Sequence, residues 1–136
     1  MKHRILLLIR LLCTGTLVAE IAPHEYRLMQ QGSPEQIQIK VLSVSKAYKL
    51  FSGNTHVTVQ AEVQQIARSQ SKLSVGDRIT IKYTHTKLRK HWAGPRPIPI
   101  LRRKAETDAF LAFDAEQNCY VPSARGASFE PLIREY

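Results

Sequence analysis

The chain has 136 residues, the length of one domain, and its 43% apolar and 23% charged residues are typical of a globular protein. This composition excludes a disordered chain, and no apolar run reaches the roughly 18 to 20 residues of a membrane-spanning helix. Lysine and arginine number 20 against 11 acidic residues, which gives a formal net charge of +9. That charge favours partners that are anionic.

The first residues have the order of a secretion signal. Two cations, Lys2 and Arg4, precede the apolar run of residues 5–9. We therefore predict a signal peptide over residues 1–19 and a periplasmic or secreted protein. The alternative is an uncleaved hydrophobic first helix.

The two cysteines bear on lipid attachment and on disulfide bonding. Lipid attachment at Cys13 is not expected, because Leu12 stands where a lipoprotein signal has a small residue. Cleavage after residue 19 leaves Cys119 as the one thiol of the mature chain, so no internal disulfide forms. The apolar neighbours of Cys119 predict a buried, inert thiol.

The middle of the chain alternates apolar and polar residues with a period of two, which is the pattern of strands with one buried face. The apolar positions change parity between Val41 and Val44, and this change predicts a β-bulge or a bend in the first strand. Gly76 falls in a turn where a positive φ is convenient. The five expected strands cover residues 36–50, 57–63, 78–83, 109–113 and 118–121.

Helical signals are poor in this sequence. Only residues 33–36 and 61–69 have any helical character, and β-branched residues oppose the second segment. Five strands with little helix predict a mainly β fold, a small five-stranded barrel of the OB-fold type. We expect residues 20–35 to lead into a single barrel domain over residues 36–136.

Two alternating segments are joined by a Gly-Asp turn: Val59-x-Ala61-x-Val63 and Leu73-x-x-Gly76-Asp77-x-Ile79-x-Ile81-x-Tyr83. They resemble the second and third strands of the netrin-like domains, an OB-fold group that includes the tissue inhibitors of metalloproteinases. The resemblance covers residues 36–122 and implies a netrin-like barrel in an exported protein, similar to exported bacterial proteins with this domain. Protease inhibition is the alternative function that it suggests. The inhibitors' N-terminal cysteine and disulfide framework are missing here, so no residue takes over that role.

The segment 84–104 is the most distinctive stretch of the chain. Three prolines at alternate positions within residues 95–99 forbid a regular helix, so we predict an extended loop. Trp92 and Ile98 are large apolar residues in this loop. They either cap the open end of the barrel or form an exposed recognition surface.

Residues 78–104 contain nine lysines and arginines and no acidic residue. Such a patch binds phosphate or sulfate polymers, anionic lipid headgroups or an acidic protein, and the alternative is a merely solvated basic face. Nucleic acid is not expected for an exported protein; a cytoplasmic one would favour single-stranded nucleic acid. The candidate binding residues are Arg78, Lys82, Lys87, Arg89, Lys90, Trp92, Arg96, Arg102, Arg103 and Lys104.

Catalytic and metal-binding patterns are missing from the sequence. It has no Walker loop, no zinc-protease helix and no nucleophile elbow. His85 and His91 have a weak ligand-like spacing, but His85 shares the phase of Tyr83 and is expected at the rim or in the core. We therefore expect a binding module without enzymatic activity, metal or cofactor.

Overall fold

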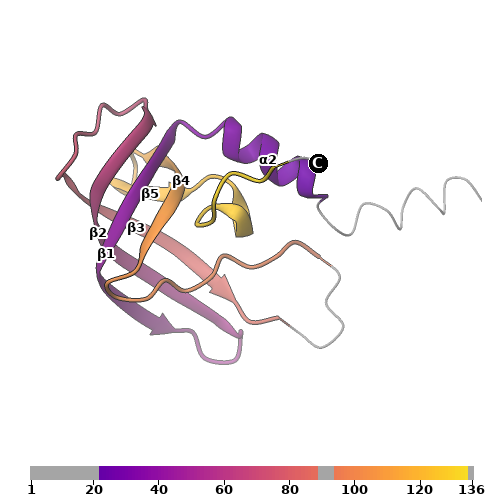
Figure 1. Cartoon of the computed structure of the whole chain (residues 1–136). Helices are drawn as coiled ribbons and strands as arrows, with labels where there is room; N and C mark the ends of the chain where they lie inside the picture. The colour runs from indigo at the N-terminus through magenta and orange to yellow at the C-terminus, as the bar shows by residue number, and fades with distance from the viewer. Residues whose placement is uncertain (1–21, 89–93, 135–136) are drawn as a thin grey trace, which may run out of the picture.

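The fold is known from a computed structural model that describes residues 22–88 and 94–134 (Figure 1). The predicted signal peptide at residues 1–19 lies outside this range. Neither helix of the described residues has the length and apolar character needed to cross a membrane. The elements in chain order are α2 (Pro23–Gln31), β1 (Glu35–Tyr48), β2 (Asn54–Ser69), β3 (Arg78–Thr86), β4 (Glu106–Asp114), β5 (Cys119–Pro122) and the 3₁₀ helix η1 (Arg125–Ala127).

The five strands close into a barrel in the order β1-β2-β3-β5-β4, and β4 pairs back onto β1 (Figure 1). Neighbouring strands are antiparallel except β3 and β5, which are parallel. This is the small five-stranded barrel of an OB-fold. The predicted fold class is therefore confirmed.

β1 is long and changes its pairing along its length. Residues 35–40 pair with β4 and with β2, whereas from Ser43 onward β1 pairs with β2 alone. Val41 pairs with Ala61 and Ser43 with Gln60, so Leu42 is an extra residue on the β1 side. This is the bulge that the parity change predicted. After the bulge, Val44 and Lys46 lie on the same face of the sheet as Val59 and Val57, their buried partners on β2. Lys46 itself is exposed.

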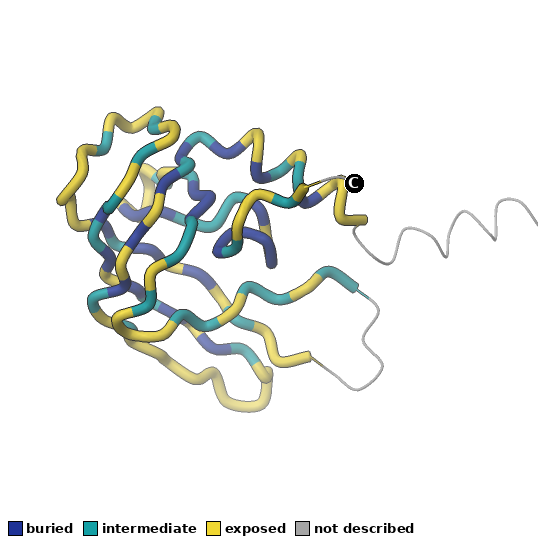
Figure 2. The backbone as a smooth tube through the Cα atoms, in the orientation of Figure 1, coloured by how far each residue is buried: buried dark blue, intermediate teal, exposed yellow. Residues whose placement is uncertain are grey.

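The core fills the inside of the barrel with alternate residues from the strands. Figure 2 shows buried and exposed residues alternating along them. Tyr83 is 9% exposed and belongs to this core, as its phase with Ile79 and Ile81 predicted. Cys119 is a free thiol with 2% exposure, which confirms its predicted burial.

Neither of the two segments with weak helical character forms a helix. Residues 35–36 begin β1, residues 61–69 belong to β2, and the helix of this region is α2, at Pro23–Gln31. A proline at its first position presets φ for the first turn. Its buried residues, Tyr26 and Gln30, lie four residues apart on one face. Because Gln30 is polar, a search for apolar periodicity overlooks this face.

α2 packs against the C-terminal segment through a second, smaller cluster of buried residues, Tyr26, Phe110, Ala124 and Ala127. Gln30 adds hydrogen bonds, because its Nε2 donates to the carbonyl oxygen of Ala127 at 2.9 Å. The described part of the predicted lead-in, residues 22–35, is therefore an integral part of the packed structure.

Candidate functional site

The Pro-rich segment 94–101 is extended, as its prolines predicted, and side chains of β3 hold it in place. The Tyr83 hydroxyl donates to the carbonyl oxygen of Pro99 at 2.8 Å and accepts the N–H of Leu101 at 3.2 Å. Two residues further along β3, His85 Nδ1 lies 2.7 Å from the carbonyl oxygen of Ile98. Because prolines have no backbone N–H, this segment cannot pair with β3 as a regular strand does. The side-chain hydrogen bonds from β3 take the place of that backbone pairing.

Burial raises the pKa of the Tyr83 phenol, and the hydrogen bond from the Leu101 backbone lowers it by a smaller amount. The net direction is upward, away from neutral pH. The phenol is therefore protonated at neutral pH and keeps its donor for the Pro99 carbonyl.

Ile98 caps the barrel. It is half-buried, and together with Ile100 and Leu101 it packs against the main core cluster. This packing agrees with the capping alternative for Ile98, which also lines a groove at the surface. Trp92, which was considered with it, lies outside the described residues.

Arg96 is engaged within the protein. Its Nη2 lies 2.7 Å from Glu130 Oε1, and its guanidinium carbon lies 4.7 Å from the centroid of the Tyr26 ring. Its backbone N–H donates to the Tyr26 hydroxyl at 3.0 Å. Partial burial lowers the pKa of Arg96, but the opposing influence of Glu130 and Tyr26 is larger and raises it overall. Arg96 thus anchors the Pro-rich segment to α2 and to the C-terminal segment.

A groove of about 700 Å³ lies between β1 and the segment that leads into β4. It exists because β4 pairs with β1 only as far as Lys40, which leaves the edge of β1 open from Ser43 onward. We call it the basic groove. Its lining residues are Leu42, Ser43, Val44, Lys46, Ile100, Leu101, Arg102 and Arg103.

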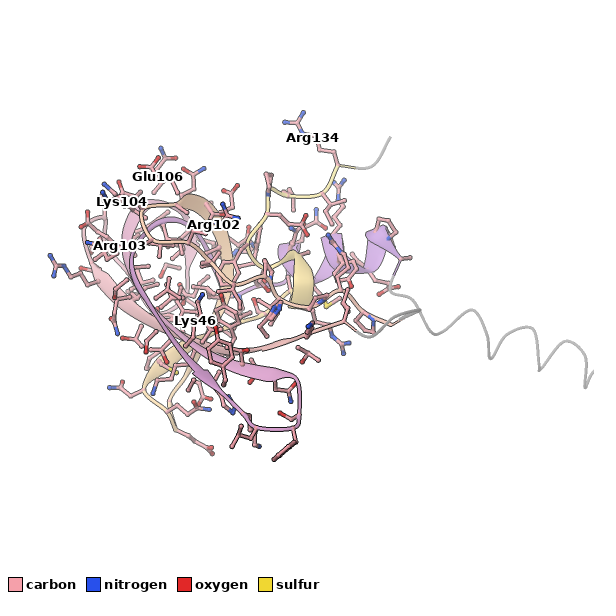
Figure 3. All side chains as sticks on the ribbon, turned by 90° about the horizontal axis from the view of Figure 1, so that it is seen from below. Lys46, Arg102, Arg103, Lys104, Glu106 and Arg134 are labelled. Carbon is pink, nitrogen blue, oxygen red and sulfur yellow. The ribbon has the colours of Figure 1, made fainter. Side chains whose placement is uncertain are left out.

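Backbone hydrogen bonds fix both walls of the basic groove. Lys104 N–H donates to the Val41 carbonyl oxygen and Val41 N–H donates to the Ala105 carbonyl oxygen, each at 2.8 Å. These bonds fasten the end of the loop beside the β1 bulge. Figure 3 shows Arg102, Arg103 and Lys104 projecting from this loop, with Lys46 on the neighbouring strand. The predicted triple cation therefore gains a fourth member from β1.

That fourth member was missed in the sequence because it belongs to a second stretch without acidic residues. Residues 36–61 contain no Asp or Glu, and their cations are Lys40, Lys46 and Lys49. The two backbone hydrogen bonds of Val41, with Lys104 and Ala105, place this stretch beside residues 102–104. A longer counting window reveals the signal, because residues 36–105 hold 14 cations and 2 acidic residues.

Other candidate residues lie apart from the basic groove. Arg78 and Lys82 are exposed on the outer face of β3, as alternation predicted, and Arg78 pairs in register with Glu62. Lys87 lines a second groove, of about 640 Å³, together with Arg96 and Arg125. The remaining candidates, Arg89, Lys90 and Trp92, lie outside the described residues.

The acidic residues concentrate in the other part of the chain. From residue 106 onward there are six acidic residues and two cations, Arg125 and Arg134. Along the chain, cations are thus concentrated in residues 36–105 and acidic residues in the C-terminal third. In the barrel the two parts meet where β4 pairs with β1 and Glu106 lies opposite Lys40.

Within residues 22–88 and 94–134, no three His, Cys, Asp or Glu side chains gather closely enough to hold a metal ion. His85 is engaged with the Ile98 carbonyl at the rim of the barrel, the position expected for it. Its predicted spacing partner, His91, lies outside the described residues.

Comparisons of this chain with protein-family models, with curated proteins and with solved structures find no match.

Proposed function

We propose that this protein is an exported, non-enzymatic binding module whose basic groove binds a phosphate-bearing or sulfate-bearing component of the cell envelope. The observation that carries the proposal is the convergence of two stretches without acidic residues on one groove. Lys46 comes from the first stretch, and Arg102 and Arg103 come from the second. The secretion-signal order of the first 19 residues supports the envelope as the setting.

The groove has the chemistry that such a ligand needs. An arginine guanidinium presents a planar fork of donors that matches two oxygens of a phosphate or sulfate group. Lys46 of β1 and the two arginines line the same groove, so an anionic group in it meets cations from two elements. Val44 and Ile100 on the walls reduce the polarity around those contacts and strengthen them.

The OB-fold order also supports a netrin-like identity for the barrel, which forms part of the proposal. The turn between β2 and β3 agrees with the resemblance, since Gly76 has a φ of 94°. Protease inhibition is not part of the proposal, because the cysteine that carries it in the inhibitors has no counterpart here. Single-stranded nucleic acid is not favoured either, because the proposal places the protein outside the cytoplasm. Tyr83, the aromatic residue that β3 contributes to the basic segment 78–104, is buried and offers no stacking surface.

Reversal of the two arginines tests the proposal. We expect Arg102→Glu/Arg103→Glu to weaken binding to inorganic polyphosphate about a hundredfold at low salt, because two charge-assisted contacts become repulsive. The measurement is calorimetric titration of the full chain over a series of salt concentrations. The slope of log affinity against log salt should also become shallower by about two.

Lys72→Glu/Arg134→Glu is the matched control, because it changes net charge equally at exposed positions away from the groove. Figure 3 shows Arg134 on the C-terminal segment, apart from Arg102, Arg103 and Lys104. We expect a loss of about threefold or less in this control, through the general field of the protein. Equal losses in the two variants would show that net charge alone attracts the polyanion, and the groove would be rejected as the site.

A further inference from the structure

The hairpin that joins β1 to β2 exposes three large apolar side chains. Tyr48 is 76% exposed, Leu50 is 83% exposed and Phe51 is 104% exposed. Figure 2 shows this hairpin as a continuous exposed stretch, in contrast to the alternating strands. We call residues 48–53 the hairpin tip. Single exposed apolar residues are common, but three within four positions mark an interaction site.

The backbone of the tip gives a second, independent sign that these side chains serve a function. Phe51 has a φ of 66°, in the left-handed region that favours glycine and asparagine. Gly53, two positions later, has a φ of 69° and uses glycine as expected. A fully exposed phenylalanine in this conformation adds strain and no packing, so the fold itself does not explain its presence.

Cations surround the hairpin tip. Lys46 and Lys49 lie on either side of Tyr48 and are exposed. The N–H of Lys87 donates to the Gly53 carbonyl oxygen at 3.1 Å, which brings the end of β3 against the tip. Leu88, the next residue, is half exposed and extends the apolar surface. Because residues 36–61 contain no acidic residue, the whole hairpin is positive.

We propose that the hairpin tip inserts into the interface of an anionic lipid bilayer. The inference rests on the proposed function and names its ligand surface, since lipid phosphates present the groups that the basic groove fits. A projecting tip with apolar ends suits a fluid interface, where Leu50 and Phe51 enter the acyl boundary. Tyr48 places an amphipathic ring at headgroup level, and the lysines extend their charged ends to the phosphates.

Substitution at the tip separates this inference from a purely electrostatic one. The variant Leu50→Ser/Phe51→Asn removes apolar surface without changing charge, and asparagine tolerates the left-handed φ of position 51. We expect its partition onto phosphatidylcholine vesicles containing phosphatidylglycerol to fall about tenfold or more, because both apolar side chains are lost. Its melting temperature should stay equal or rise, since the strain at position 51 is relieved. The measurement is vesicle flotation together with thermal unfolding of the full chain.

Val75→Ser is the control variant, because Val75 is also an exposed apolar residue. It lies in the β2–β3 loop, at the end of β2 opposite to the hairpin tip. It should partition onto the anionic vesicles like the unaltered protein. Vesicles of pure phosphatidylcholine should bind neither Val75→Ser nor the unaltered protein. Equal partition of the tip variant and the unaltered protein would overturn insertion. So would binding to polyphosphate without binding to anionic vesicles, although the proposed function would then stand. A protein that binds neither probe would refute both proposals.

Discussion

Replacing Gln30 by leucine is expected to lower the free energy of unfolding by about 3 kcal/mol. Gln30 is fully buried on α2 and satisfies three backbone groups of the C-terminal segment. Its Nε2 donates to the carbonyl oxygens of Ala127 and Pro131 at 2.9 and 3.2 Å, and its Oε1 accepts the N–H of Ile133 at 2.9 Å. Leucine fills a similar volume but leaves these groups without partners, and each unsatisfied group costs about 1 to 3 kcal/mol where it stays buried.

Urea unfolding measures the effect, with Gln31→Leu as the control. Gln31 is the next residue on α2 and is exposed, so its replacement should change stability by about 0.5 kcal/mol or less. If Gln30→Leu unfolds at the same urea concentration as the control, α2 does not depend on this contact with the C-terminal segment.

Replacing Gly126 by alanine is expected to cost about 1 to 3 kcal/mol, because the added methyl group meets a fixed backbone. A Cβ at this position would lie 2.7 Å from the Arg96 carbonyl oxygen and 2.8 Å from the Arg96 Cβ. Gly126 does not have a positive φ, so alanine is acceptable to the local backbone and the clash is the sole obstacle. The Pro-rich segment cannot easily retreat, since Arg96 is held by Glu130 and Tyr26.

The same substitution in an Arg96→Ala background provides the check. Alanine at position 96 keeps the Cβ and the carbonyl oxygen that cause the clash, but it removes the contact with Glu130 that helps to hold the segment. The cost of Gly126→Ala in thermal and urea unfolding should therefore become smaller in this background without disappearing. If that cost disappears, the obstacle is the arginine side chain with its contacts and not the close approach of the backbone at this point.

The barrel was predictable because period-two alternation depends on local burial, which a sequence records directly. Even the bulge at Leu42 was visible, since it forces the apolar residues that follow to change parity. α2 was not predictable in the same way. Its buried face includes Gln30, which is buried only because backbone groups about 100 residues later accept and donate its hydrogen bonds.

The candidate site was predicted only in part. The run of cations at 102–104 can be read directly from the sequence. The contribution of Lys46 depends on the pairing of β1 and on the backbone hydrogen bonds of Val41. The role of Arg96 could not be foreseen, because its partner Glu130 is distant in sequence. Lone charges in a sequence do not tell whether a cation is free for a ligand or engaged within the fold.

The central claim is that the surface formed by residues 42–53 and 100–104 is where the protein meets an anionic ligand. The measurement that tests it most directly is a titration of the isotopically labelled full chain with polyphosphate, followed by backbone amide chemical shifts. We predict that the largest shift changes occur in these two stretches and that β4 and β5, beyond residue 106, change little. Changes concentrated on the outer face of β3 around Arg78 and Lys82, or no localised changes at all, would contradict the claim.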